Sequence, residues 1–227
     1  MQEREVLNLI PAKDGKTYLI DENGAYWRSY IFITDAVSYD LVEKPEDFYE
    51  SAVAFGRFQE MLADYPAETL HETIRDFHDT KKRLQALKNA VKEDVCHRAS
   101  GVQKEINFAL EHEEIADVFG DLLRKGELPL RVTHNDTTGK GICVVDLDTV
   151  MPGLAMNDFG DAIRFGASTA LEDEKDLSKV SCNMELYEAY VKGFLESCGD
   201  KLTRKEIELL PMGAKVMTYE CGIRFLT

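Results

Sequence analysis

The sequence predicts an α+β protein in which a short β-rich beginning is followed mostly by helices. Residues 4–34 are rich in Tyr, Ile and Trp around an "ENG" turn, a pattern typical of a hairpin with two or three strands. From Lys44 onward apolar residues recur at helical intervals, interrupted by a second β stretch around "PLRVTHND" and "GICVVDLDTV". Strands and helices that are segregated in this way indicate the α+β class.

The β-rich beginning is too short to be stable alone, because so few strands need a partner face to pack against. We therefore expect the chain to lack its beginning. Four later segments share the apolar spacing of helices: 45–65, 78–126, 184–198 and 204–225. Pro45 and acidic residues start the first, and the second holds one long or two adjacent helices with Gly126 as the C-cap. Thr203 and Glu206 predict a capping box at the start of the last.

The charge balance excludes some classes of partner. The chain has 27 basic and 42 acidic residues, a formal net charge of −15, and no dense basic patch, so we expect neither nucleic acid nor a membrane as a partner. Its five cysteines are scattered and lack a C-x-x-C pair, so neither a zinc site nor a disulfide framework is indicated. The charged N-terminus resembles no signal peptide, and no apolar segment approaches about 18 residues. We expect a soluble, cytoplasmic protein.

Two groups of carboxylates are candidates for chemistry. His134, Asn135 and Asp136 follow the apolar "LRV" and precede a Thr-Thr-Gly turn, which predicts a strand end where side chains face a cleft. Taken alone, this pattern is more often a solvated turn with a structural histidine. Asp146 follows "ICVV", a run typical of a buried strand, and a carboxylate there needs a cation, a metal or hydrogen-bond donors. Two such sites within ten residues favour a function.

Two other motifs suggest alternatives. Asp146 and Asp148 fit the D-x-D pattern of haloacid-dehalogenase-type phosphatases, in which the first Asp is the nucleophile and the second a general acid. That fold needs a doubly wound sheet, whereas only about 80 mostly helical residues follow here. The "DFG" at 158–160 is similar to the magnesium motif of protein kinases, but "MPGLAMN" before it is expected to be a loop. We expect Asp158 or Asp161 to brace the loop around Asp136 instead.

Three blocks carry a specific resemblance: "LPLRVTHND", "ICVVDLDTVMPGLAMNDFGDAIRFGAST" and "LPMGAKVMTYECGIRFLT". With "YWRSYIFITDAVSYDLVEKPEDFY", they resemble the N-acetylhexosamine 1-kinases, members of the aminoglycoside phosphotransferase and choline kinase-like superfamily. The resemblance extends over nearly the whole chain. It implies a protein-kinase-like fold, in which residues 1–34 are the remaining N-lobe strands up to the hinge and residues 35–227 the helical C-lobe. Residues 30–34 would be the last N-lobe strand.

The resemblance also implies an activity and its cofactors. ATP and Mg²⁺ would serve to phosphorylate the anomeric C1 hydroxyl of N-acetylglucosamine or N-acetylgalactosamine. Asp136 would be the catalytic residue that orients the sugar hydroxyl, and Asp146 would hold the metal, an arrangement that suits phosphoryl transfer. His134, with Asp158 and Asp161, would support the catalytic loop.

Two further residues resemble the family's acceptor pocket. Arg224 resembles an arginine that contacts the sugar, and Phe165 resembles an aromatic residue that lines the pocket. The alternatives are an exposed arginine on a helix surface and a phenylalanine of the core.

The chain departs from the family pattern at several points. Only ten positions separate Asp136 from Asp146, too few for the family's metal-binding Asn and intervening strand, and Asn135 lies on the wrong side of the base. The glycine-rich phosphate loop, the strand lysine and its glutamate partner would lie upstream of Met1. Two hypotheses follow: a fragment or edited version of a sugar kinase, or a catalytically silent sugar-binding remnant.

Overall fold

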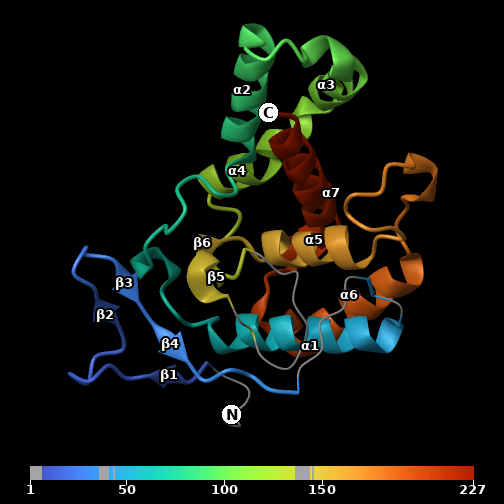
Figure 1. The fold of residues 1–227 in the computed structure, drawn as a ribbon. Helices are drawn as coiled ribbons and strands as arrows, with labels where there is room; N and C mark the ends of the chain where they lie inside the picture. Colours follow the sequence, from blue (N-terminus) through green and yellow to red (C-terminus); the bar gives the residue numbers. More distant parts are fainter. Residues whose placement is uncertain (1–6, 36–40, 43, 136–143, 145) are drawn as a thin grey trace.

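The structure is a computed structural model, and its description covers residues 7–35, 41–42, 44–135, 144 and 146–227. Figure 1 shows a helical body with a small β-rich part beside it. In that part β1 (Leu9–Ile10) pairs with β4 (Ser29–Tyr30), and β2 (Leu19–Ile20) pairs with β3 (Tyr26–Trp27), both antiparallel. The mixed, mostly helical content agrees with the predicted α+β class.

The predicted "ENG" hairpin is confirmed as the β2–β3 pair. Asp21 organises its turn, because its carboxylate accepts the N–H groups of Asn23 and Ala25, and Gly24 takes the left-handed backbone conformation (φ 81°). The strand expected over residues 30–34 is wrong, since β4 ends at Tyr30. The side chains of these four short strands are exposed, so little apolar packing holds them.

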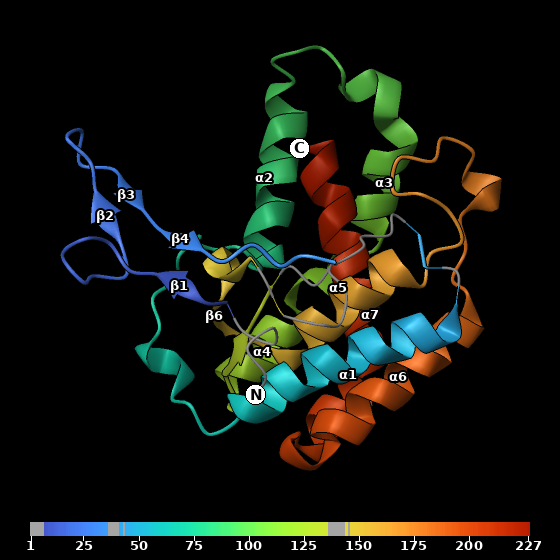
Figure 2. The same ribbon diagram turned by 60° about the horizontal axis from the view of Figure 1, so that its bottom comes forward.

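Two helix pairs form the body. Helix α1 (Pro45–Met61) lies along α6 (Met184–Cys198), and α5 (Ala155–Gly166) crosses α7 (Arg204–Leu226), as the two views in Figures 1 and 2 agree. The aromatic rings of Phe159, Tyr190 and Phe194 are fully buried between these helices, with centroids 5.5 and 5.6 Å from Phe159. Edge-to-face rings at this spacing pack favourably, so the core joins α5 to α6.

Helices α5 and α7 meet backbone to backbone at two glycines. A Cβ placed on Gly160 would lie 2.3 Å from the carbonyl oxygen of Gly213. A Cβ on Gly213 would lie 2.3 Å from the carbonyl oxygen of Met156. Because real Cβ atoms essentially never come closer than 3.0 Å to such atoms, only glycine permits this crossing. The crossing fixes the two helices that carry most of the charged residues discussed below.

Two of the remaining helices, α2 (Thr80–Glu93) and α3 (Gln103–Glu111), lie beside the end of α7 (Figure 1). Helix α4 (Val118–Arg124) instead packs Phe119 into the core that holds Phe159 and Phe194. Residues 78–126 were expected to form one or two helices, and three are found. Asp94 ends α2 in the left-handed conformation (φ 37°), and its carboxylate accepts the N–H groups of Arg98 and Ala99. This local competition for backbone donors breaks the helix.

Several predicted helix ends are confirmed. Thr203 and Glu206 form the capping box of α7. Gly126 (φ 71°) follows α4, its N–H bonds to Leu123, and the next N–H bonds to Leu122, as in a Schellman motif. Helix α1 instead ends at Met61, four residues before the expected position. Short 3₁₀ helices occur at 67–69, 99–102, 113–117, 147–149, 177–179 and 199–201.

One strand was missed. Residues 151–153, expected to lie in a loop, form β6 (Met151–Gly153), which pairs antiparallel with β5 (Arg131–Thr133). Thr133 pairs with Met151, and Pro152, which lacks an N–H, is tolerated because the described residues form a ribbon of two strands here. The last three residues of "MPGLAMN", expected to lie in a loop, and the "DFG" residues after them lie inside helix α5.

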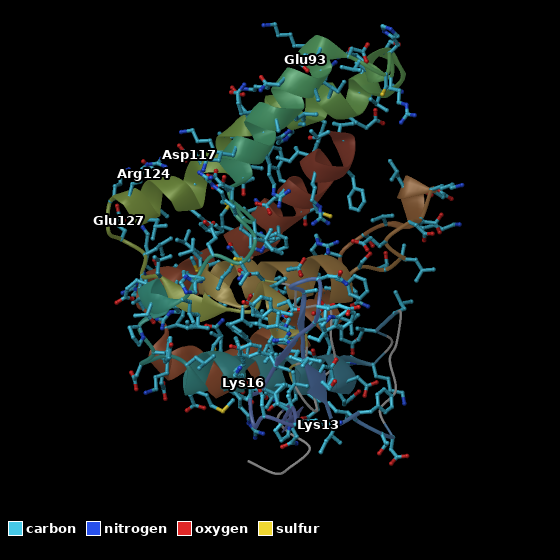
Figure 3. The ribbon with its side chains drawn as sticks, turned by 60° about the vertical axis from the view of Figure 1, so that its left-hand side comes forward. Lys13, Lys16, Glu93, Asp117, Arg124 and Glu127 are labelled. Atoms are coloured by element: carbon cyan, nitrogen blue, oxygen red, sulfur yellow. The ribbon has the colours of Figure 1, made fainter. Side chains whose placement is uncertain are left out.

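Some charged side chains lie on the outside of the molecule, as Figure 3 shows for Glu93, Asp117 and Arg124. The Arg124 guanidinium lies 2.9 Å from the Asp117 carboxylate, an exposed pair of the kind that adds little stability. None of the helices among the described residues is both long and apolar enough to span a membrane.

Candidate functional site

The backbone after β5 is held by one buried carboxylate. Asp158, in the first turn of α5, is fully buried and accepts the N–H of His134 at 2.9 Å and the N–H of Asn135 at 2.7 Å. The side-chain amide of Gln59 donates a third hydrogen bond at 2.7 Å. Burial raises the pKa of the Asp158 carboxyl, and the donors oppose that shift because they favour the charged form. Asp158 therefore ties α1 and α5 to the segment that precedes Asp136.

Asn135 adopts a left-handed backbone conformation and is buried. Its φ of 65° is unusual for a residue with a side chain, although Asn tolerates it better than most residues. The side-chain amide donates to the carbonyl groups of Thr133 (3.2 Å) and Thr149 (2.9 Å), and its oxygen accepts from the Thr133 hydroxyl (2.9 Å). These bonds hold the chain where it turns towards Asp136, which itself lies outside the described residues.

His134 is buried against aromatic rings. Its imidazole meets Phe55 edge to face at 5.7 Å and Phe58 at 6.1 Å between ring centroids, and both phenylalanines come from α1. The histidine thus packs against α1 in the helical body. This position is compatible with a supporting role, which stays a prediction.

The two carboxylates of the D-x-D pattern have different surroundings. Asp146 is exposed, has a φ of 61° and directly precedes the 3₁₀ helix Leu147–Thr149. Most of the "ICVV" run before it lies outside the described residues, so the strand expected there stays a prediction. Asp148 forms an ion pair with Arg28, and its carbonyl accepts a hydrogen bond from Thr73 at 2.8 Å.

Asp146 is the carboxylate expected to hold Mg²⁺. The exposed Asp146 offers hard oxygen atoms, and one or two carboxylates plus substrate phosphates suffice for this ion. Within the described part of the chain, no group of three or more potential metal ligands occurs. Among the described residues Asp146 thus offers part of a coordination shell for this ion, and other ligands would have to complete it.

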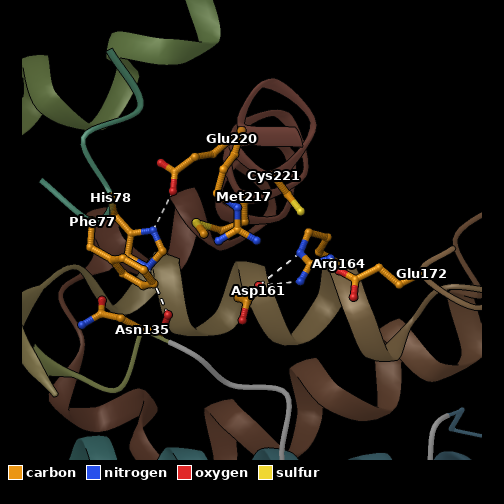
Figure 4. Close-up of a pocket in the computed structure, with 10 residues that line it drawn as sticks. Phe77, His78, Asn135, Asp161, Arg164, Glu172, Met217, Glu220 and Cys221 are labelled. Carbon is orange, nitrogen blue, oxygen red and sulfur yellow. Dashed lines mark hydrogen bonds and ion pairs between the residues drawn. The ribbon is translucent and has the colours of Figure 1, made fainter. Parts of the chain in front are cut away.

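A polar cavity of about 180 Å³ lies beside Asn135 (Figure 4). Its walls come from the segment before α2, from α5, from α7 and from the loop after α5, and the lining residues are Phe77, His78, Asn135, Asp161, Arg164, Glu172, Met217, Glu220, Cys221 and Arg224. Arg164 is paired on both sides, 3.1 Å from Asp161 and 2.7 Å from Glu172. The cavity thus combines fixed cationic and anionic groups next to the loop.

The cavity brings together some of the residues named from the sequence. Asp161 and Arg224 line it together with Asn135, the residue before the predicted base. Phe165 is half-buried on α5 and is not among the lining residues, and Asp146 is not among them either. Sequence reasoning missed His78 and Glu220. The sequence does hold a signal for Glu220, because this carboxylate lies between Tyr219 and Ile223 on the apolar face of a predicted helix. A charged residue at such a position indicates a buried partner.

The comparison with protein families decides the assignment. The model of the phosphotransferase enzyme family matches residues 16–197. The chain belongs to the phosphotransferase enzyme family. This match includes the β5 loop and α5, whereas α7 lies beyond it.

A solved structure supports the fold of this phosphotransferase. The microcompartment-associated aminopropanol kinase matches with a TM-score of 0.52 and 15% identity, over 98% of this chain and 67% of that chain. At this identity the likeness shows the fold alone, and it confirms the predicted kinase-like fold. The division at residue 34 into two lobes stays a prediction.

Proposed function

We propose that this phosphotransferase transfers a phosphoryl group from ATP to the anomeric C1 hydroxyl of an N-acetylhexosamine. The observation that carries the proposal is the polar cavity beside Asn135, because it lies next to the residue predicted to orient the acceptor. An N-acetylhexosamine offers several hydroxyl groups and one amide, and the cavity's carboxylates and guanidinium groups are suitable hydrogen-bond partners for both. The resemblance of the three sequence blocks supplies the sugar class and its position of attack.

The proposal gives each residue a role. Asp136 orients the sugar hydroxyl and accepts its proton, and Asp158 holds the backbone on which Asp136 is carried. Arg224 contacts the sugar from α7, with Phe165 as a second predicted contact. Mg²⁺, held by Asp146, would neutralise charge on the phosphates of ATP. We expect this reaction to occur in the cytoplasm.

An ADP-release assay with the purified chain tests the activity. N-acetylglucosamine and N-acetylgalactosamine should each raise ADP release above the level without sugar, and glucose serves as the control that lacks the acetamido group. The sugar assignment fails if neither N-acetylated sugar raises the signal. Asp136→Asn should lower the rate by about 10²- to 10⁴-fold, because a general base is removed.

Arg224 can be tested with a matched control on the same helix. Arg224→Ala removes a charged hydrogen-bond donor and should raise the KM for the sugar about tenfold. Arg204→Ala removes an exposed arginine at the other end of α7, where it pairs with Glu208 at 2.7 Å, and should leave KM unchanged. Equal effects of the two substitutions would refute the contact.

A catalytically silent sugar-binding domain is the second candidate. It is favoured by the close spacing of Asp136 and Asp146 and by the lack of a metal-ligand cluster among the described residues. Calorimetry separates the two, since a silent domain binds sugar without binding ATP in a magnesium-dependent way. The phosphatase alternative loses support, because the strands in the described ranges form only two-stranded antiparallel pairs.

A further inference from the structure

The imidazole of His78 lies between two hydrogen-bond acceptors from distant parts of the chain. Its Nδ1 is 2.8 Å from a carboxylate oxygen of Glu220, and its Nε2 is 3.3 Å from the backbone carbonyl oxygen of Asn135 (Figure 4). The Asn135 carbonyl can only accept, so Nε2 must donate the proton of that bond. The ring thus bridges Glu220 on α7 to Asn135, which follows β5.

Glu220 is a firm anchor for this bridge. Its side chain is only 5% exposed. The Oε2 atom of Glu220 accepts a hydrogen bond from the Thr80 hydroxyl, and the Arg83 Nε lies 3.5 Å from Oε1, the oxygen that faces His78. A buried carboxylate needs such compensation, because an unpaired charge in the interior is costly. Arg83 is itself fixed by a hydrogen bond of 3.0 Å from its Nε to the Phe77 carbonyl. The charges facing His78 thus come from α7 and from the start of α2.

The carbonyl of Asn135 completes the set of bonds that hold this residue. The N–H of Asn135 bonds to Asp158, and its side chain bonds to Thr133 and Thr149. Among the residues that the structure describes, the partner of its carbonyl is His78. The carbonyl belongs to the peptide group that leads into Asp136. The imidazole therefore helps to hold its orientation, in a residue whose backbone is left-handed.

We propose that His78 is a positioning residue for phosphoryl transfer. It fixes the peptide that leads into Asp136 and, through Glu220, couples this peptide to α7. Glu220 and Arg224 are four residues apart on α7, so they lie on the same face of the helix. One helix thus sets both the loop and the proposed sugar contact. The inference rests on the proposed function, since it takes Asp136 as the group that orients the acceptor.

The first measurement needs no substitution and no substrate. Nitrogen NMR of the isotope-labelled full chain should show a proton on Nε2 of His78. An unprotonated Nε2 would overturn the proposal, because that nitrogen could not donate to the Asn135 carbonyl. This readout is independent of the sugar assignment, so its failure is distinguishable from failure of the proposed function.

Two substitutions then separate positioning from packing. His78→Gln keeps an amide donor near the place of Nε2, whereas His78→Asn keeps one near the place of Nδ1 and loses the bond to Asn135. The carbonyl carbon shift of Asn135 should change in His78→Asn and stay close to wild type in His78→Gln. His71→Gln, at an exposed histidine, is the matched control and should change nothing.

Kinetics give the second readout. In the ADP-release assay, His78→Asn should lower kcat by about 10- to 100-fold, with the KM for sugar nearly unchanged, because a small displacement of a catalytic group has effects of this size. His78→Gln should restore most of the loss. Equal kcat values for the Asn and Gln variants, or an unchanged Asn135 carbonyl shift in His78→Asn, would overturn the proposal.

Discussion

Substitution of Gly213 by alanine should weaken the packing of α5 against α7. The new Cβ would lie 2.3 Å from the Met156 carbonyl oxygen, and ordinary contact starts at 3.4 Å, so the helices must separate by about 1 Å. Overpacking of this kind costs about 1–3 kcal/mol, and the upper half applies because the opposing atom is backbone. Alanine regains about 1 kcal/mol of helix propensity. We expect a net loss of about 1–2 kcal/mol in the free energy of unfolding.

Urea denaturation followed by far-UV circular dichroism measures this loss. The midpoint for Gly213→Ala should fall by about 0.5–1 M. Gly222→Ala is the matched control, because a Cβ there meets nothing within 4 Å in the same helix. It should gain up to about 1 kcal/mol from helix propensity alone. If Gly213→Ala is as stable as Gly222→Ala, the close crossing does not limit the packing and the reasoning fails.

Three other predictions concern buried polar groups. Asp158→Asn should lower the free energy of unfolding by about 1–3 kcal/mol for each N–H group left without an acceptor, measured by urea denaturation. Arg131→Met should cost about 3–5 kcal/mol, because it leaves the buried Glu206 unpaired, and adding Glu206→Gln should recover part of this loss in the same assay. Burial raises the pKa of the Cys198 thiol from 9.0 to about 12, because the interior disfavours the charged thiolate. The unfolded chain therefore loses this proton first, and the free energy of unfolding should fall as the pH rises from 9.0 to about 12. At pH below 9.0 a thiol reagent should modify the exposed Cys96 and should reach Cys198 only on unfolding; reaction of both at equal rates would contradict the assignment.

The helix ends that the sequence predicted well are those with a local signal. Met184 starts α6 because the Asn183 side chain accepts two N–H groups of the first turn. The Thr203 side chain accepts one, from Glu206, at the start of α7. Such bonds span two or three residues, so the sequence displays them directly. Strand β6 has no such signal, since Met151 pairs with Thr133, which lies 18 positions earlier. The pairing is a tertiary event.

The candidate site likewise contains residues that lie near a motif in the sequence and residues that only tertiary packing brings there. Asp158 and Asp161 stand close to the loop motif in sequence, so a role beside it could be expected, although their catalytic function stays a prediction. His78 and Glu220 are 142 positions apart, and only the packing of α7 against the start of α2 brings them together. Nothing in the residue pattern alone specifies that contact. Asp136, the residue on which the hypothesis depends most, lies outside the described residues.

The exposed position of Trp27 in the β-rich part provides a built-in optical probe. It is the single tryptophan of the chain, it is 61% exposed, and its indole N–H donates to Asp21 at 2.9 Å. Its fluorescence therefore reports on the hairpin, whereas circular dichroism reports on the helices. Coincident transitions in the two signals would show that the hairpin and the helical body unfold as one cooperative unit, and separate transitions would show two.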